Sequence, residues 1–203
     1  MPDWIKEAGV TAYPLILCSL ISLAVIFDRA LFWMKHRAAS HTVLREKVID
    51  YVRQSRINEA LKVSEGSEDY LVKIYREGLN HHELSFLQAL EIGVEKELKS
   101  MKKYLTVLDT IITLSPLLGI LGTIFGIISS FDVLGAAGLQ DPKLVTGGIA
   151  EALISTAMGL SIAILTLIPF NYFQSLIESK VSDMQSQVTN FELMYNKGSR
   201  SSF

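Results

Sequence analysis

The chain has almost no cysteine and almost no net charge. Its 203 residues include a single cysteine, Cys18, which stands inside an apolar run, so a framework of disulfide bonds is excluded. Lysine and arginine number 19 against 21 aspartate and glutamate residues, which gives a net charge of −2. Because nucleic-acid-binding domains carry a strongly basic face, we expect no nucleic-acid partner.

The sequence also lacks the short motifs that carry enzymatic or metal chemistry. No segment fits the G-x-x-x-x-G-K-[ST] pattern of a phosphate-binding loop. The four histidines do not stand at metal-ligand spacing with other ligands, and no nucleophile stands in a recognisable arrangement with a base. We therefore expect no enzyme, no cofactor and no metal.

Long apolar runs dominate what is present. Hydrophobic residues make up 49% of the chain, and three runs are long enough to cross about 30 Å of hydrocarbon as helices. We predict an all-α membrane protein with three transmembrane helices, whose long helices extend into a cytoplasmic helical domain. The predicted segments are an N-terminus at 1–9, transmembrane helices at 10–33, 105–131 and 147–171, a cytoplasmic helical domain at 34–104, a loop at 132–146 and a C-terminal helix at 172–203.

Positive charges predict the orientation of these spans. Three basic residues, Arg29, Lys35 and Arg37, follow the first apolar run, and three lysines precede the second. Lysine and arginine near short spans mark the cytoplasmic side. We expect the connection between the first two spans and the C-terminal tail to be cytoplasmic, and the N-terminus and second loop to be periplasmic. The start of the chain is not basic, so we predict an uncleaved first span rather than a signal peptide.

The cytoplasmic connection and the tail carry helical patterns. Ser67, followed by two acidic residues, predicts the start of a helix, and Gly78 predicts its end. From about Leu84 the apolar spacing stays helical into the second span, so we predict one uninterrupted helix much longer than the bilayer is thick. Apolar residues recur at spacings of four and three from Phe173 to Phe191, which favours packing of the tail against that long helix over contact between subunits.

Small and weakly polar residues form a stripe on the second and on the third span. The stripe on the second span comprises Ser115, Gly119, Gly122, Thr123, Gly126 and Ser130. The stripe on the third span comprises Ala152, Thr156, Gly159, Ala163 and Thr166. Small residues let membrane helices approach closely, so packing alone is one explanation of the two stripes, and a polar path is the other.

Two threonines stand at the same predicted depth. Taking Ile120 and Gly159 as the middles of their spans, Thr123 and Thr156 each lie about 4.5 Å to the periplasmic side, at 1.5 Å per residue. Repeated around an oligomer, these hydroxyls would form a polar ring inside an apolar bundle. A threonine can relay a proton through water but cannot store one near neutral pH. If protons cross here, a partner helix must supply the titrating group, most simply a carboxylate.

Charged residues occur only near the ends of the spans. Glu151 is predicted about 12 Å to the periplasmic side of the midplane, where it either reaches the headgroups or faces buried water. Asp28 and Asp109 lie at the inner edge, where pairing with Arg29 or with a neighbouring lysine would account for them.

The two stripes resemble the signature of the MotA/TolQ/ExbB proton-channel family, most closely its ExbB members and next its TolQ members. The matching stretches are SPLLGILGTIFGIISSF, from Ser115, and GIAEALISTAMGLSIAILTLIPFNYF, from Gly148. The resemblance implies that Thr123 and Thr156 are pore threonines and that Glu151 is the glutamate of the family motif. Ser115 and Ser155 are further candidate pore hydroxyls. The candidate residues for packing and shaping the pore helices are Pro116, Gly119, Gly122, Gly126 and Gly159.

The resemblance also implies an assembly. A homopentamer would surround a central pore, with transmembrane helices of an ExbD-like single-span partner inside it. The aspartate of that partner would be the titrating group, and the work would pass to a TonB- or TolA-like energy transducer.

We therefore expect a proton-channel or motor subunit in a bacterial inner membrane that uses the proton-motive force to energise outer-membrane transport. Two alternatives stay open from the residues. One is a TolQ-like subunit that serves envelope integrity, and the other is a non-conducting membrane scaffold whose hydroxyls only pack helices.

Overall fold

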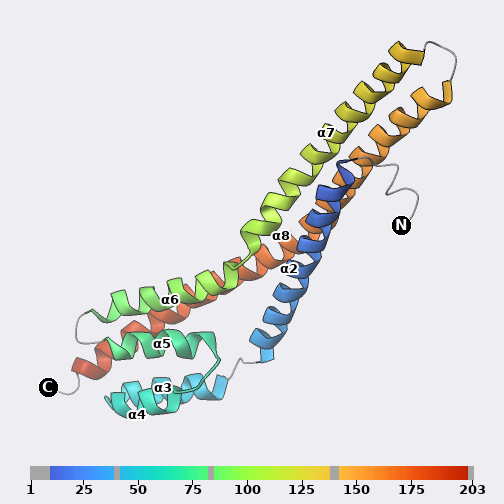
Figure 1. Ribbon diagram of the computed structural model, residues 1–203. Coiled ribbons are helices and arrows are strands. Elements are labelled where there is room, and N and C mark those ends of the chain that lie inside the picture. The colour runs from blue at the N-terminus through green and yellow to red at the C-terminus, as the bar shows by residue number, and fades with distance from the viewer. Residues whose placement is uncertain (1–9, 39–41, 82–84, 138–141, 201–203) are drawn as a thin grey trace. The chain divides into compact units, whose positions relative to one another are not determined.

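The computed structural model describes residues 10–38, 42–81, 85–137 and 142–200, and every regular element among them is an α-helix (Figure 1). The helices are α2 (Ala12–Ala38), α3 (Thr42–Arg53), α4 (Ile57–Ser64), α5 (Tyr70–Asn80), α6 (Phe86–Lys102), α7 (Leu105–Ala137) and α8 (Pro142–Arg200). The predicted all-α fold is confirmed. The predicted N-terminal segment 1–9 lies outside the described residues.

Three of these helices are long and apolar enough to cross a membrane. The candidate spans are Ala12–His36, Leu105–Asp132 and a stretch within Thr146–Lys197. Helices α7 and α8 both continue into the predicted loop 132–146, since α7 ends at Ala137 and α8 begins at Pro142.

The chain divides into two compact units. The first, which we call the membrane unit, contains Met1–Asp28 and Tyr104–Tyr172, and the second, which we call the helical domain, contains Arg29–Lys103 and Phe173–Phe203. Helices α2 and α8 each contribute residues to both units.

Glycines bring α7 and α8 close together in the membrane unit. A Cβ atom on Gly119 would lie 3.1 Å from the Cα atom of Thr156, and one on Gly126 would lie 2.8 Å from the Gly148 carbonyl oxygen. A Cβ atom on Gly159 would lie 3.0 Å from the Cα atom of Gly119. No larger residue fits at these points without moving backbone, so the small residues set the spacing of the two helices.

Neither proline ends its helix. Pro116 lies inside α7 and Pro169 inside α8. Pro116 has no N–H to offer the carbonyl one turn earlier, and neighbouring hydroxyls commonly satisfy such groups in membrane helices. Ser115 donates its hydroxyl to the Ile111 carbonyl, which is next to the Ile112 carbonyl that lacks the N–H of residue 116.

The helical domain packs the C-terminal half of α8 against α5 and α6. The rings of Tyr75 and Phe191 stack at a centroid distance of 4.0 Å, and those of Phe86 and Tyr195 stack at 3.9 Å. Met184 is also fully buried. The predicted packing of the tail within the chain is therefore confirmed.

The prediction of one uninterrupted helix entering the second span is wrong. Helix α6 ends at Lys102 and α7 begins at Leu105, and Tyr104 between them has a φ of 65°. A residue in this left-handed region cannot continue a right-handed helix. Near the end of α6, the Ser100 carbonyl accepts hydrogen bonds from the Arg29 side chain at 3.2 Å and from the Lys103 N–H at 3.4 Å.

The predicted bounds of the helix after Ser67 are also wrong. Asp69 is the N-cap of α5, because its carboxylate accepts hydrogen bonds from the backbone N–H groups of Leu71 and Val72. The Ser67 hydroxyl instead accepts from the Asp69 N–H at 3.2 Å. Helix α5 continues past Gly78 to Asn80, and a Cβ atom on Gly78 would lie 2.6 Å from Leu90. Gly78 therefore allows close packing of α6 on α5 and does not end the helix.

Candidate functional site

Thr123 of α7 and Thr156 of α8 meet in the membrane unit. Their hydroxyl groups are hydrogen-bonded to one another, and either can be the donor. Both side chains are half-buried. The two threonines that the sequence predicts at equal depth are therefore in direct contact, on one edge of the α7–α8 interface.

Backbone carbonyls complete the hydrogen bonding of this pair. The Gly119 carbonyl lies 3.1 Å from the Thr156 hydroxyl and 3.2 Å from the Thr123 hydroxyl, and the Ala152 carbonyl lies 3.2 Å from the Thr123 hydroxyl. Each hydroxyl has one proton to donate. Thr123 can donate to Thr156, which then donates to Gly119, or Thr156 can donate to Thr123, which then donates to a carbonyl. The pair thus has two satisfied arrangements that differ in the direction of its hydrogen bonds.

Ser115 and Ser155 are fully buried beside the threonines, and their hydroxyls are already bonded. Ser115 donates to its own helix at Ile111. The Ser155 hydroxyl is 2.8 Å from that of Thr11, just before α2. Both serines therefore lie inside the helix contacts of this chain. Thr11 escaped sequence analysis, because its partner is 144 residues away and only the fold brings them together.

Gly148 and Ser130 extend the contact toward the C-terminal end of α7 and the N-terminal end of α8. Ser130 donates to the Gly126 carbonyl at 2.9 Å, and a Cβ atom on Gly148 would strike the Ser130 hydroxyl. The sequence does indicate Gly148, because Gly148, Ala152 and Thr156 follow one another at intervals of four residues. Residues at this spacing share one face of a helix.

Glu151 does not join the threonines. It precedes Thr156 by five residues, which places the two side chains about 140° apart around α8 at 3.6 residues per turn. Glu151 is half-buried, and its carboxylate makes no hydrogen bond or ion pair with the residues that the structure describes. Within one chain, the carboxylate and the threonine pair therefore lie on different faces of α8.

The charged residues predicted at the inner edge of the membrane differ in their burial. Arg29 is buried, and its guanidinium lies 4.7 Å from the ring centroid of Phe32 in addition to bonding the Ser100 carbonyl. Asp28 on α2 and Asp109 on α7 have exposed side chains. Pairing of Asp28 with Arg29 stays a prediction. Within the described ranges, no group of three or more histidine, cysteine, aspartate or glutamate side chains could hold a metal ion.

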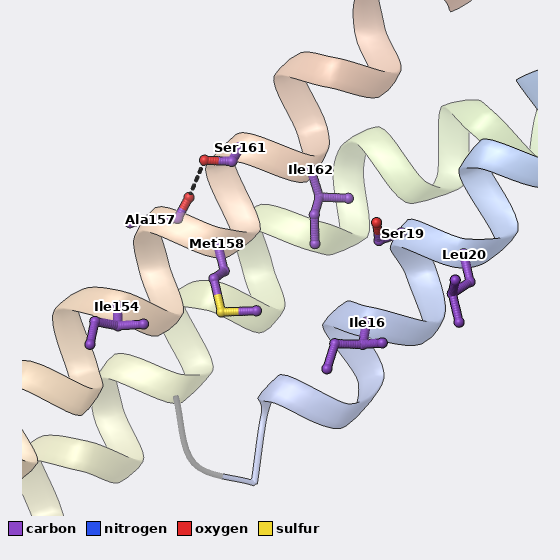
Figure 2. A pocket seen from close by; sticks show the side chains of 8 residues that line it. All are labelled: Ile16, Ser19, Leu20, Ile154, Ala157, Met158, Ser161 and Ile162. Carbon is purple, nitrogen blue, oxygen red and sulfur yellow. Dashed lines mark hydrogen bonds between the residues drawn. The ribbon is translucent and has the colours of Figure 1, made fainter. Parts of the chain in front are cut away.

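A groove of about 460 Å³ separates α2 from the other face of α8 (Figure 2). It is lined by Ile16, Ser19, Leu20, Ile154, Ala157, Met158, Ser161 and Ile162. The Ser161 hydroxyl donates to the Ala157 carbonyl of its own helix at 2.7 Å (Figure 2). Met158 follows Thr156 by about 200° around the helix. Helix α8 therefore turns a mostly apolar face, with Ser161, toward this groove and its threonine face toward α7.

Known proteins match most of this chain. The profile of the MotA/TolQ/ExbB proton channel family matches residues 62–186, which include both threonines. The putative biopolymer transport protein ExbB-like 3 of Synechocystis sp. is 36% identical over 194 residues, covering 93% of this chain and 92% of that protein. The Tol-Pal system protein TolQ of Haemophilus influenzae is 29% identical over 111 residues, covering 55% of this chain and 49% of that protein.

Proposed function

Because the chain belongs to the MotA/TolQ/ExbB proton channel family, we propose that it is a proton-conducting motor subunit in which Thr123 and Thr156 pass protons. It uses the proton-motive force to energise outer-membrane transport as part of an ExbB-ExbD-TonB-like complex. Each elementary charge that crosses 100 mV supplies about 2.3 kcal/mol, so a few protons suffice for a mechanical step. Similarity along nearly its full length to an ExbB-like protein supports this role over a TolQ-like one.

The observation that carries the proposal is the hydrogen bond between Thr123 and Thr156. Two hydroxyls that can reverse their hydrogen bonds can hand a proton along a chain of water, but neither can hold a charge near neutral pH. Asp109 stands four helical turns from Thr123, and Glu151 lies on another face of α8. The titrating group must therefore come from outside the chain, and we assign it to an aspartate of an ExbD-like single-span partner.

An oligomer would place the threonine pair in contact with water and not with lipid. In a lone chain a half-buried hydroxyl pair on the edge of a helix contact would face lipid, where polar groups are costly. Several copies, five by likeness to the family, would place the pairs around a shared axis that holds water and the partner helices. We propose that the N-terminus is periplasmic and the C-terminus cytoplasmic in a bacterial inner membrane, as the basic residues predict.

The other site residues take supporting roles in this proposal. Pro116 and the glycines of the α7–α8 contact set the spacing of the pore helices. Ser155 holds α8 to the start of α2 through its buried hydrogen bond to Thr11, and Ser115 bonds its own helix. Glu151 stands about 7.5 Å along the helix axis from Thr156. We place it at the periplasmic mouth, where it meets water or a neighbouring subunit, and not beside the threonines.

The test replaces one hydroxyl with a methyl group of the same shape. Thr156→Val should abolish energised transport in cells while the variant still assembles and co-purifies with its partner. The matched control is Thr166→Val, because Thr166 is buried on the same helix but donates only to its own Ile162 carbonyl at 2.8 Å. Transport that survives Thr156→Val as well as it survives Thr166→Val would favour a membrane scaffold.

A further inference from the structure

The helical domain holds a polar pocket that the proposed proton path does not use. Its volume is about 320 Å³, within the range of small-ligand sites. Lys35 and His36 from the end of α2, Lys73 from α5 and Glu97 from α6 contribute to its walls, with Glu68 from the segment before α5. All of these residues belong to the helical domain.

The pocket combines two cations with two carboxylates, and only part of this charge is paired inside the chain. Lys73 and Glu68 form an ion pair at 2.6 Å. Neither Lys35 nor Glu97 has a hydrogen-bond or ion-pair partner among the described residues. Burial raises the pKa of Glu97 above its ordinary value, and the nearby Lys73 offsets this only in part, so a further cation beside the carboxylate would stabilise its charged form. A ligand that brought one positive and one negative group would satisfy both unpaired side chains.

His36 adds an unsatisfied polar atom to the pocket lining. Its ring stacks between Phe32 at 5.5 Å and Tyr70 at 5.0 Å. This sandwich fixes the ring, and its Nε2 atom is buried without a hydrogen-bond partner among the residues described. Buried polar atoms almost always have a partner.

One wall of the pocket comes from the end of the first apolar helix. The first candidate span ends at His36, and Phe32, Lys35 and His36 form its last turn. Aromatic and basic side chains at the end of a span mark the boundary between hydrocarbon and headgroups. Basic pockets at this level are suited to lipid phosphates.

We propose that this pocket binds the zwitterionic headgroup of a phosphoethanolamine lipid. Lys35 and Lys73 hold the phosphate beside the His36 ring, and Glu97 accepts hydrogen bonds from the primary ammonium. A purely anionic headgroup would leave Glu97 uncompensated. A choline headgroup carries no N–H to donate, so the site distinguishes ethanolamine from choline.

Native mass spectrometry of the full-length chain in detergent tests the assignment. Delipidated protein is mixed with equal amounts of short-chain phosphatidylethanolamine, phosphatidylglycerol and phosphatidylcholine. The ethanolamine lipid should be retained best, and Lys73→Met should weaken it about tenfold, the effect of one charge-assisted hydrogen bond. The matched control is Lys96→Met, which breaks the Lys96–Glu77 pair at 2.5 Å outside the pocket and should leave binding unchanged.

Two further variants keep the test independent of folding. Lys35 is exposed and has no ion pair to lose, so Lys35→Met should weaken binding without changing the circular dichroism spectrum. Glu97→Gln should bind ethanolamine and choline lipids equally. Equal loss in Lys73→Met and Lys96→Met, or an ethanolamine preference that survives Glu97→Gln, would overturn the proposal.

A last comparison tests whether the ligand of the pocket is a membrane lipid or a free, soluble headgroup. Free phosphoethanolamine should bind at least about tenfold more weakly than the lipid, because acyl chains beside the span add apolar burial. Binding of the free headgroup as tight as that of the lipid would reject the membrane origin.

Discussion

At the scale of single residues, the hydroxyls of the spans differ in what they bond. Thr110, Ser161 and Thr166 donate to carbonyls of their own helices, as membrane serines and threonines commonly do. Thr123 and Thr156 instead bridge two helices. A hydrogen bond between membrane helices contributes about 0.6 kcal/mol on average. The pair therefore contributes little to stability, and its role in conduction stays a proposal.

The Thr123 hydroxyl should matter for conduction far more than for stability. Thr123→Val should stop proton-driven transport while lowering stability by only about 0.6 kcal/mol. Thr123→Ser keeps the hydroxyl and should retain transport. Transport assays and thermal melts of both variants check this, and equal transport by the serine and valine variants would exclude the hydroxyl from the path.

Residue-level sequence reasoning succeeded where helix geometry alone decides position. The meeting of Thr123 and Thr156 follows from 1.5 Å of rise per residue in two antiparallel spans. The sequence already placed Glu151 at another depth than the threonines, and the angle around α8 adds that it lies on another face, so its role in the pore stays a prediction. Thr11 was missed because nothing near it in the chain indicates that Ser155 is its partner.

At the scale of helices, the α7–α8 contact depends on glycines, which have no side chain to keep the backbones apart. Gly119 and Gly159 lie back to back, so that a Cβ atom on either would press on the other's backbone. Rigid backbone on both sides leaves little room for relaxation. The same spacing places Thr123 and Thr156 within hydrogen-bond reach, so helix packing and the geometry of the site depend on the same glycines.

Enlarging Gly159 by one methyl group should therefore disturb both packing and site. Gly159→Ala should lower stability by about 1–3 kcal/mol, the usual effect of overpacking, and should reduce transport. The control is Gly147→Ala on the same helix, where a Cβ atom would meet nothing within 4 Å. Thermal melts in detergent measure the difference. Equal melting temperatures for the two variants would contradict the close approach of the helices.

The helical domain is organised around the N-cap of α5. The Asp69 carboxylate is fully buried, caps α5 and also binds Arg45 at 2.8 Å. The neighbouring Tyr70 bonds Asp183 of α8. These contacts connect α3, α5 and the tail of α8 within one domain.

Removing this carboxylate should destabilise the domain strongly. Asp69→Ala should cost about 3 kcal/mol, because it removes the cap and leaves a part-buried Arg45 without this partner. Asp69→Asn keeps a capping oxygen and should cost less. Chemical denaturation followed by circular dichroism distinguishes the two. Equal losses would show that the charge, and not the cap, dominates.

Element-level predictions failed at the ends of helices. The apolar spacing through Leu98 and Leu105 continues as if no break existed, yet Tyr104 takes a left-handed conformation between them. Left-handed turns usually carry glycine or asparagine, so tyrosine gives no signal. At α5 both Ser67 and Asp69 are capping residues by type, and only the fold shows that Asp69 also meets Arg45.

At the scale of the whole molecule, the proposed proton path needs residues from more than one kind of chain. Among the described residues, the chain supplies closely spaced helices and a reversible hydroxyl pair, with no ionisable group on the same face beside that pair. The proposed proton path therefore requires a carboxylate from a partner. Sequence patterns could predict the three spans and this missing acid, whereas the number of copies and the partner follow only from likeness to the family.

Proton flux across liposomes tests this central claim most directly. The purified chain is reconstituted alone and with its single-span partner, and uptake is followed with a pH-sensitive dye under an imposed potential. The account predicts no flux from the chain alone, flux from the complex, and loss of that flux in the complex with Thr156→Val but not with Thr166→Val. Flux from the chain alone, or undiminished flux with Thr156→Val, would contradict it.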